Sequence, residues 1–208
     1  MMREIEKNFA MALSIIFQPI FVPLYSLVIL FNADTYITYA VQPEVKKFIL
    51  LVTFLNTIIL PIGVFYYFYR AKLIDSFHMH TAKERSLPFL TTIVFHMSTF
   101  YLFSKAPMPS LFANLVLGAA FSVATAFVIN LKWKVSIHML GMGGIVGTII
   151  GLILRYQVDA VQLVMALVIL SGFVGYARLR LNAHTPLQVY IGFLLGTLIL
   201  TGTVVLPY

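Results

Sequence analysis

Long apolar segments are the feature that most constrains the fold of this chain. Seven of them approach or exceed the roughly 20 residues that an α-helix needs to cross about 30 Å of hydrocarbon. A soluble fold could not bury them all, because 61% of the 208 residues are hydrophobic and only 10% are charged, against about 25% in an ordinary soluble domain. The sequence therefore predicts an all-α, polytopic integral membrane helix bundle. The predicted spans are residues 10–31, 46–69, 87–104, 110–131, 136–154, 161–177 and 187–207.

The first of these spans is expected to be retained in the mature protein. It follows the sequence Met-Met-Arg-Glu-Ile-Glu-Lys and is too long for the apolar core of a secretory signal, which has about 7 to 15 residues. We expect residues 1–208 to form a single integral membrane domain, located in a bacterial inner (cytoplasmic) membrane.

Small and polar residues inside the spans predict how the helices pack. Prolines are tolerated in membrane helices and are expected to kink them, at Pro19, Pro23 and Pro61. Glycines at four-residue spacing predict faces on which helices approach closely, at Gly143, Gly147, Gly151, Gly192 and Gly196. Buried amides are expected to form interhelical hydrogen bonds, at Asn56, Asn114 and Asn130. His96, inside the third span, is expected to be a neutral, hydrogen-bonded interior residue.

Composition excludes several kinds of site. The chain has no Cys, so it can form neither a disulfide framework nor a thiolate metal site. Its five His residues show no familiar metal-ligand spacing, and we expect neither a metal nor a cofactor. The net charge is +7, but no run of five basic residues occurs, which argues against nucleic acid as a partner. Anionic lipid headgroups are the expected partners.

Counting seven crossings places three clusters of basic and polar residues on the same side of the membrane. The clusters are Lys83 with Arg85, then Lys134, Ser136 and His138, and then Arg178, His184 and Gln188. Lys and Arg at span ends usually reach for lipid headgroups or set topology. A His is not needed for that purpose, so the pairing of Arg178 with His184, and of Lys134 with His138, indicates an anion site.

Two of the clusters lie where a helix begins. Thr185 followed by Pro186 is typical of a helix start, with Thr at the N-cap and Pro at the first helical position. Gln188 follows His184 by four residues, so one helical turn could bring its amide to an imidazole nitrogen. Ser136 and His138 open the fifth span in the same way, where unpaired backbone N–H groups favour an anion.

The spacing of these residues resembles a known family. Arg-x5-His-x3-Gln, with Ser-x-His some forty residues earlier and Lys-Glu-Arg-x-x-Pro before that, is similar to the three motifs of the type 2 phosphatidic acid phosphatase superfamily of membrane lipid phosphatases. That family has Lys-x6-Arg-Pro, Pro-Ser-Gly-His and Ser-Arg-x5-His-x3-Asp. The resemblance covers residues 78–198 and implies a six-helix phosphatase-like core with one additional span.

The chain departs from each of the three motifs. In the first motif, His78 falls in the place of the Lys, and Pro88 lies three residues after Arg85. In the second and third motifs the replaced residues are Val135 for Pro, Ile137 for Gly, Ala177 for Ser and Gln188 for Asp. A neutral Gln amide can orient an imidazole but gives no electrostatic support to its charged form.

The resemblance implies a role for each matching residue. His184 would attack phosphorus and His138 would protonate the leaving oxygen, while Gln188 orients His184. Arg178, Arg85 and Ser136 would hold the phosphoryl oxygens, and we infer that Lys83 or Lys134 supplies a further ammonium group. Phosphoryl transfer depends mainly on positioning and on positive charge around these oxygens.

The expected function is hydrolysis of a phosphate monoester or diphosphate of an isoprenoid or glycerolipid through a phosphohistidine intermediate. Because Gln188 replaces Asp, the alternative is a non-catalytic lipid-phosphate binder or carrier that retains the pocket. A transferase that passes the phosphoryl group to an acceptor other than water would use the same residues.

Overall fold

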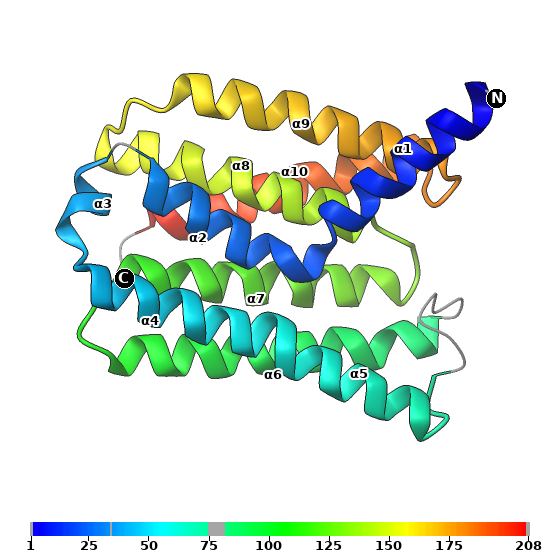
Figure 1. The fold of residues 1–208 in the computed structure, drawn as a ribbon, viewed down its shortest axis with the longest axis horizontal. Helices are drawn as coiled ribbons and strands as arrows, with labels where there is room; N and C mark the ends of the chain where they lie inside the picture. Colours follow the sequence, from blue (N-terminus) through cyan, green and yellow to red (C-terminus); the bar gives the residue numbers. More distant parts are fainter. Residues whose placement is uncertain (1, 34, 75–81, 207–208) are drawn as a thin grey trace. The chain divides into compact units, whose positions relative to one another are not determined.

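The computed structural model describes residues 2–33, 35–74 and 82–206, with the backbone alone described at residues 2, 3, 37 and 82–85. In these ranges all regular structure is helical (Figure 1). The elements are α1 (Met2–Ile16), η1 (Pro19–Phe21), α2 (Val22–Asn32), α3 (Tyr36–Ala40), α4 (Pro43–Phe54), η2 (Leu55–Ile59), α5 (Leu60–Arg70), α6 (Ala82–Lys105), α7 (Ser110–Asn130), α8 (Ile137–Tyr156), α9 (Val161–Arg180) and α10 (Pro186–Val205).

Seven helical segments of the described chain are long and apolar enough to cross a membrane. Each overlaps one of the seven predicted spans, so the predicted fold class, an all-α bundle of membrane helices, is confirmed. The segments are Glu4–Asn32, Pro43–Arg70, Ser86–Lys105, Ser110–Asn130, Ile137–Tyr156, Val161–Arg180 and Pro186–Val205.

The chain forms two compact units. Unit 1 combines Met1–Val22 with Lys134–Tyr208 and so contains α1, η1, α8, α9 and α10. Unit 2 is the continuous segment Pro23–Trp133. The second and third sequence clusters both belong to unit 1, whereas the first belongs to unit 2. That residues 1–208 act as one domain stays a prediction.

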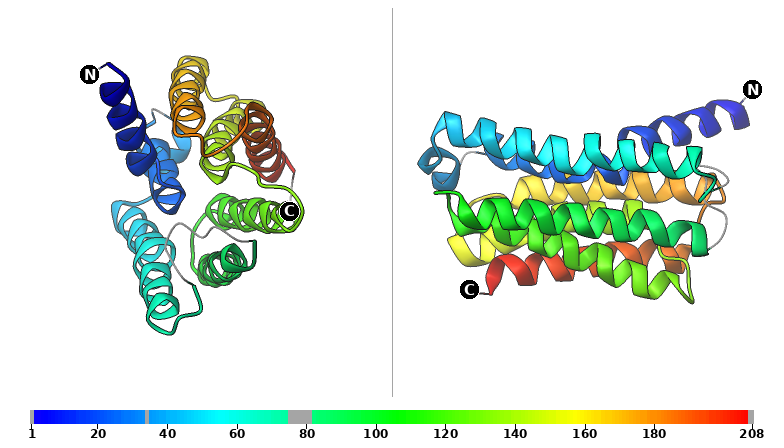
Figure 2. Two further views of the ribbon diagram at one scale, coloured as in Figure 1. Left: turned by 90° about the vertical axis from the view of Figure 1, so that its right-hand side faces the viewer. Right: turned by 90° about the horizontal axis from the view of Figure 1, so that it is seen from below.

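Helices α8 and α10 form the tightest pair of unit 1, and they run side by side in both views of Figure 2. A Cβ atom added at Gly143 or Gly147 would collide with the carbonyl oxygen of Phe193 or Thr197 on α10. In return, a Cβ at Gly196 would collide with the Leu140 carbonyl oxygen on α8. The predicted small faces therefore meet each other, and the two backbones touch because both faces lack side chains.

Helix α1 packs against α9 in unit 1 and ends well before its span does. The sequence predicts a kink at Pro19, but the structure has a break there. Gln18 has φ −59° and ψ 132°, the extended conformation favoured before a proline, because the proline ring disfavours the α region for the preceding residue. A 3₁₀ turn, η1, follows the break and leads into α2.

Unit 2 contains α6 and α7, which pack against each other with their Phe89 and Phe127 ring centroids 6.0 Å apart. In its α4–α5 segment the π-helical turn η2 ends two residues before Pro61, which has no backbone N–H to donate. His96 of α6 is buried, with Nδ1 2.8 Å from the Thr92 carbonyl oxygen. It is thus the hydrogen-bonded interior His that the sequence predicts.

Candidate functional site

The start of α8 and the turn between α9 and α10 meet at one end of unit 1. The Lys134 ammonium group donates to the Ala183 carbonyl oxygen at 3.0 Å. The Ser136 backbone N–H donates to the carbonyl oxygen of Gln188 at 3.2 Å. These bonds join the second and third clusters directly, so the two lie on the same face, as the sequence predicts.

His184 is held by Gln188 through the four-residue spacing seen in the sequence. The Gln188 Oε1 atom accepts a hydrogen bond from the Thr185 backbone N–H at 3.1 Å and lies 3.1 Å from His184 Nδ1. The backbone N–H can only donate, so the shared Gln188 atom must be the amide oxygen, and His184 Nδ1 must carry the hydrogen. In the neutral ring, the lone pair of His184 is then on Nε2.

His138, in the first turn of α8, is held in the opposite tautomer. Its Nε2 atom lies 3.1 Å from the Ser14 carbonyl oxygen and 3.2 Å from the Gln18 Oε1 atom. A backbone carbonyl can only accept, so Nε2 of His138 must carry a hydrogen. One of the two imidazoles therefore carries its hydrogen on Nδ1 and the other on Nε2.

The Ser14 carbonyl is available because α1 breaks. In a continuing α-helix, the Gln18 N–H would bond to the carbonyl four residues back, which belongs to Ser14. The Gln18 N–H instead bonds to the Ile15 carbonyl oxygen at 3.3 Å, and the next residue, Pro19, has no N–H. The proline thus leaves a backbone acceptor on α1 that His138 uses.

Arg178 reaches the same serine from α9. An Nη atom of Arg178 donates to the Ser14 hydroxyl oxygen at 3.2 Å. Its Nε atom is buried without a hydrogen-bond partner among the described residues, which leaves one guanidinium N–H for another acceptor. Arg178 and His184 also act electrostatically on His138, so the three potentially cationic groups lie near one another.

Ser136 occupies the N-cap position of α8 and is fully buried. Its side chain makes no capping hydrogen bond, and its Oγ atom has no partner within the described part of the chain. A buried hydroxyl without a partner costs free energy. Ser136 therefore has unused hydrogen-bonding capacity beneath the surface at this helix start.

The first cluster cannot be compared with the site. The side chains of Lys83 and Arg85 lie outside the described atoms, as does His78, which falls in the place of the Lys of the first motif. The phosphate-binding role of Lys83 and Arg85 stays a prediction.

Sequence reasoning missed the contribution of α1. Neither Ser14 nor Gln18 belongs to the three clusters, yet both contact His138, and Ser14 contacts Arg178 as well. An ion pair between Glu6 and Arg180, 2.7 Å long, further joins α1 to α9. The available signal was Pro19, because a proline within an apolar span exposes a backbone carbonyl.

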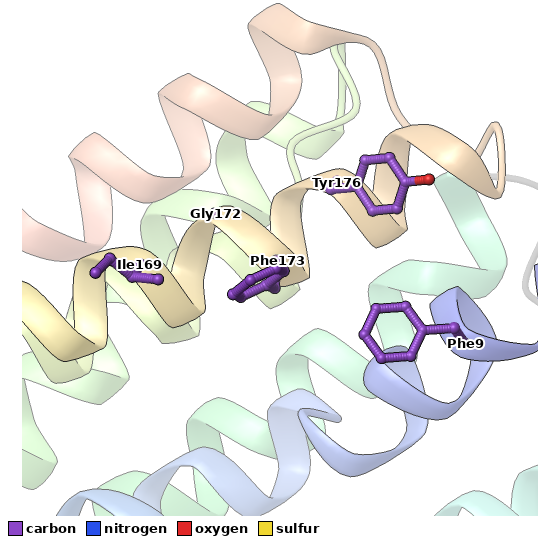
Figure 3. A pocket seen from close by; sticks show the side chains of 5 residues that line it. All are labelled: Phe9, Ile169, Gly172, Phe173 and Tyr176. Carbon is purple, nitrogen blue, oxygen red and sulfur yellow. The ribbon is translucent and has the colours of Figure 1, made fainter. Parts of the chain in front are cut away.

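An open groove of about 420 Å³ lies between α1 and α9. Its lining is apolar apart from the Tyr176 hydroxyl, and in Figure 3 Phe9 of α1 projects from the opposite wall to Phe173 and Tyr176 of α9. A groove lined this way can accept hydrocarbon but offers no charged group for chemistry. The two imidazoles of unit 1, His138 and His184, do not line this groove.

No group of three or more potential metal-ligating side chains occurs among the residues that the structure describes. No protein-family model, curated protein or solved structure matches the chain. The resemblance of its three motifs to the lipid phosphatases therefore enters the functional argument as a proposal.

Proposed function

We propose that the chain is a membrane-embedded lipid phosphatase that hydrolyses a phosphate monoester or diphosphate of an isoprenoid or glycerolipid. The observation that carries this proposal is the pair of imidazoles in opposite tautomers beside Arg178. His184 is fixed with its lone pair on Nε2, and His138 with a hydrogen on Nε2. A nucleophile and a proton donor are the two groups that phosphoryl transfer through histidine needs.

In the proposed first step, His184 Nε2 attacks phosphorus and forms a P–N bond while the bond to the leaving oxygen breaks. When the negatively charged phosphate is bound beside it, His138 takes up a solvent proton on Nδ1 and, as the imidazolium, gives its Nε2 proton to that oxygen, which leaves as an alcohol or a lipid phosphate. Gln188 accepts the His184 Nδ1 hydrogen throughout and so keeps the attacking nitrogen aimed. Arg178, Ser136 and Lys134 stabilise the charge on the equatorial phosphoryl oxygens.

In the second step, water attacks the phosphohistidine and the P–N bond breaks. His138, now neutral, takes a proton from the attacking water, and inorganic phosphate is released. Both steps use the same groups in reversed roles, so neither a metal nor a cofactor is required. The apolar exterior supports a substrate that stays in the bilayer, and we place the protein in a bacterial inner membrane.

Replacing His184 with Ala tests the proposal. With purified protein in nanodiscs and a panel of lipid phosphates, the variant should release no phosphate, because the P–N bond cannot form. Leu187→Ala is the matched control, since Leu187 lies in the first turn of α10 and is exposed. Unchanged phosphate release by His184→Ala in a folded sample would contradict the mechanism.

The second candidate function is a non-catalytic lipid-phosphate binder, and the neutral Gln188 amide beside His184 is the observation that favours it. Binding needs positive charge and donors, but not a supported imidazolium. Incubation with a ³²P-labelled lipid phosphate followed by alkaline quenching separates the two functions. A phosphatase accumulates acid-labile label on His184, whereas a binder retains intact lipid and carries no covalent label.

A further inference from the structure

We propose that Gln18 of α1 is the positioning residue for proton transfer by His138, with the Ser14 carbonyl as its fixed partner. This inference rests on the proposed function, because Gln18 would position His138, the proton donor that the phosphatase mechanism requires. The proposal makes α1, which lies outside all three motifs, a contributor of functional residues to the site.

The two acceptors on His138 differ in what they can do. Ser14 is buried, and its side-chain hydroxyl already accepts a hydrogen bond from Arg178. Its backbone carbonyl oxygen can only accept a hydrogen bond. The Gln18 side chain is exposed and ends in an amide, so it can move and can present either an acceptor or a donor. One partner therefore fixes the ring while the other can follow its protonation state.

Proton transfer requires such a change of partner. Before transfer, His138 Nε2 carries a hydrogen, which the Ser14 and Gln18 oxygens share at 3.1 and 3.2 Å. Sharing weakens the hold of each acceptor, so a leaving oxygen can displace the exposed one. After transfer Nε2 carries a lone pair that faces the Ser14 oxygen, and rotation of the Gln18 amide places an N–H there instead. Gln18 can thus hold the ring before the first transfer and again in the second step, after the leaving group has gone.

Two substitutions separate the accepting and donating roles. Gln18→Leu removes both, and we expect kcat for an alkyl phosphate to fall about tenfold, a part of the roughly 10²- to 10⁴-fold that general acid–base catalysis contributes. Gln18→Glu retains an acceptor but cannot donate when ionised. It should move the alkaline limb of the pH–rate profile to higher pH, because a carboxylate stabilises the imidazolium. It should also slow hydrolysis of the phosphohistidine, because the N–H that holds neutral His138 is lost.

The leaving group distinguishes positioning from structural damage. A nitrophenolate needs little protonation to leave, so Gln18→Leu should change the hydrolysis of nitrophenyl phosphate less than twofold and leave KM for the alkyl phosphate unaltered. Gln162→Leu is the matched control, because it removes an exposed amide from the far end of α9. An equal loss of activity on both substrates, or none on either, would overturn the proposal.

Pro19→Ala tests the fixed partner. Restoring an N–H at position 19 lets α1 continue, so that the Gln18 N–H can bond to the Ser14 carbonyl in competition with His138. We expect the same selective loss on poor leaving groups. Unchanged hydrolysis of the alkyl phosphate would contradict the role of the freed carbonyl.

A readout without turnover separates this inference from the proposed function. The Nε2–H signal of ¹⁵N-labelled His138 should shift in Gln18→Leu and stay in place in Gln162→Leu. A shift in a chain that hydrolyses neither phosphate would sink the phosphatase while leaving the contact intact. An unshifted signal in an active phosphatase would sink the positioning role alone.

Discussion

In both units several hydroxyls inside apolar helices bond to their own helix, as Thr148 and Ser171 do in unit 1, but in the described part of the chain unit 1 adds side-chain hydrogen bonds between its long helices. In unit 1, polar side chains bond between helices: His138 and Arg178 both bond to Ser14, and Thr201 of α10 donates to the Gly147 carbonyl oxygen of α8 at 3.0 Å. In unit 2, Thr57, Thr92 and Thr99 each donate to the carbonyl four residues back in their own helix.

The two kinds of hydrogen bond show that a polar side chain in a membrane helix can be satisfied with or without fixing the position of a neighbouring helix. A hydroxyl that bonds to its own helix satisfies its donor and places no constraint on a neighbour. A bond between helices fixes the distance and rotation of two segments at once, and in lipid there is little water to replace it. The bonds of His138 and Arg178 to Ser14 hold residues proposed for chemistry, where geometry must be held.

The close approach of α8 and α10 offers the sharpest way to test the comparison. Gly196→Ala should lower the free energy of unfolding by about 3 kcal/mol, at the upper end of overpacking costs, because the added Cβ meets the Leu140 carbonyl oxygen. Gly202→Ala on the same helix is the control. Its Cβ would meet nothing within 4 Å, so it should stabilise slightly, by about 0.5 kcal/mol, through helix propensity. Thermal unfolding in detergent measures both, and equal effects would refute backbone contact between these helices.

Ser14 and Thr99 compare the two kinds of hydrogen bond directly. Ser14→Ala should lower the free energy of unfolding by about 2 kcal/mol, because it removes an acceptor from the guanidinium of Arg178. Thr99→Val should cost less than about 1 kcal/mol, because the Phe95 carbonyl can retain its helical partner when the hydroxyl is lost. If the two substitutions proved equally costly, the distinction between the units would have no energetic basis.

The Glu6–Arg180 ion pair should give the smallest effect, although it also joins two helices of unit 1. Its side chains are 44% and 35% exposed, and pairs of this kind contribute about 0 to 1 kcal/mol. Glu6→Gln should lower stability by less than about 0.5 kcal/mol, and added salt should reduce even that difference. A large loss of stability that salt does not change would mean that the Glu6–Arg180 pair is as well protected from solvent as the contacts around Ser14.

Features with a local cause could be predicted from the sequence. The seven spans follow from apolar length, the small faces of α8 and α10 from glycine spacing, and the His184–Gln188 bond from a four-residue separation on one helix turn. Each depends on residues close together in the chain. The fold class was therefore predictable from the sequence, and the shared side of the second and third clusters followed from counting the spans.

Features with a non-local cause could not be predicted. Gln18 lies 120 residues before His138 and Ser14 lies 164 before Arg178, and no periodicity links such distant positions. The predicted interhelical hydrogen bonds were also wrong for two amides, whereas that of Asn114 stays a prediction. Asn56 donates to the Val52 carbonyl of its own helical segment, and the buried Asn130 side chain has no partner among the described residues. The Val52 carbonyl was available to Asn56 in its own helical segment. The sequence alone does not show whether an amide bonds to such a local acceptor or to one on another helix.

The break at Pro19 also bears on the order in which parts of the protein fold during synthesis. Ser14 is made 164 residues before Arg178, which at about 5 to 20 residues per second is an interval of roughly 8 to 33 seconds. Unit 2 is continuous from Pro23 to Trp133, so its helices can pair during that interval. The Ser14 carbonyl must be satisfied by water, lipid headgroups or a temporary partner until His138 is made, 124 residues after Ser14. The site that joins α1 to α8 and α9 is therefore among the last parts of the protein to form.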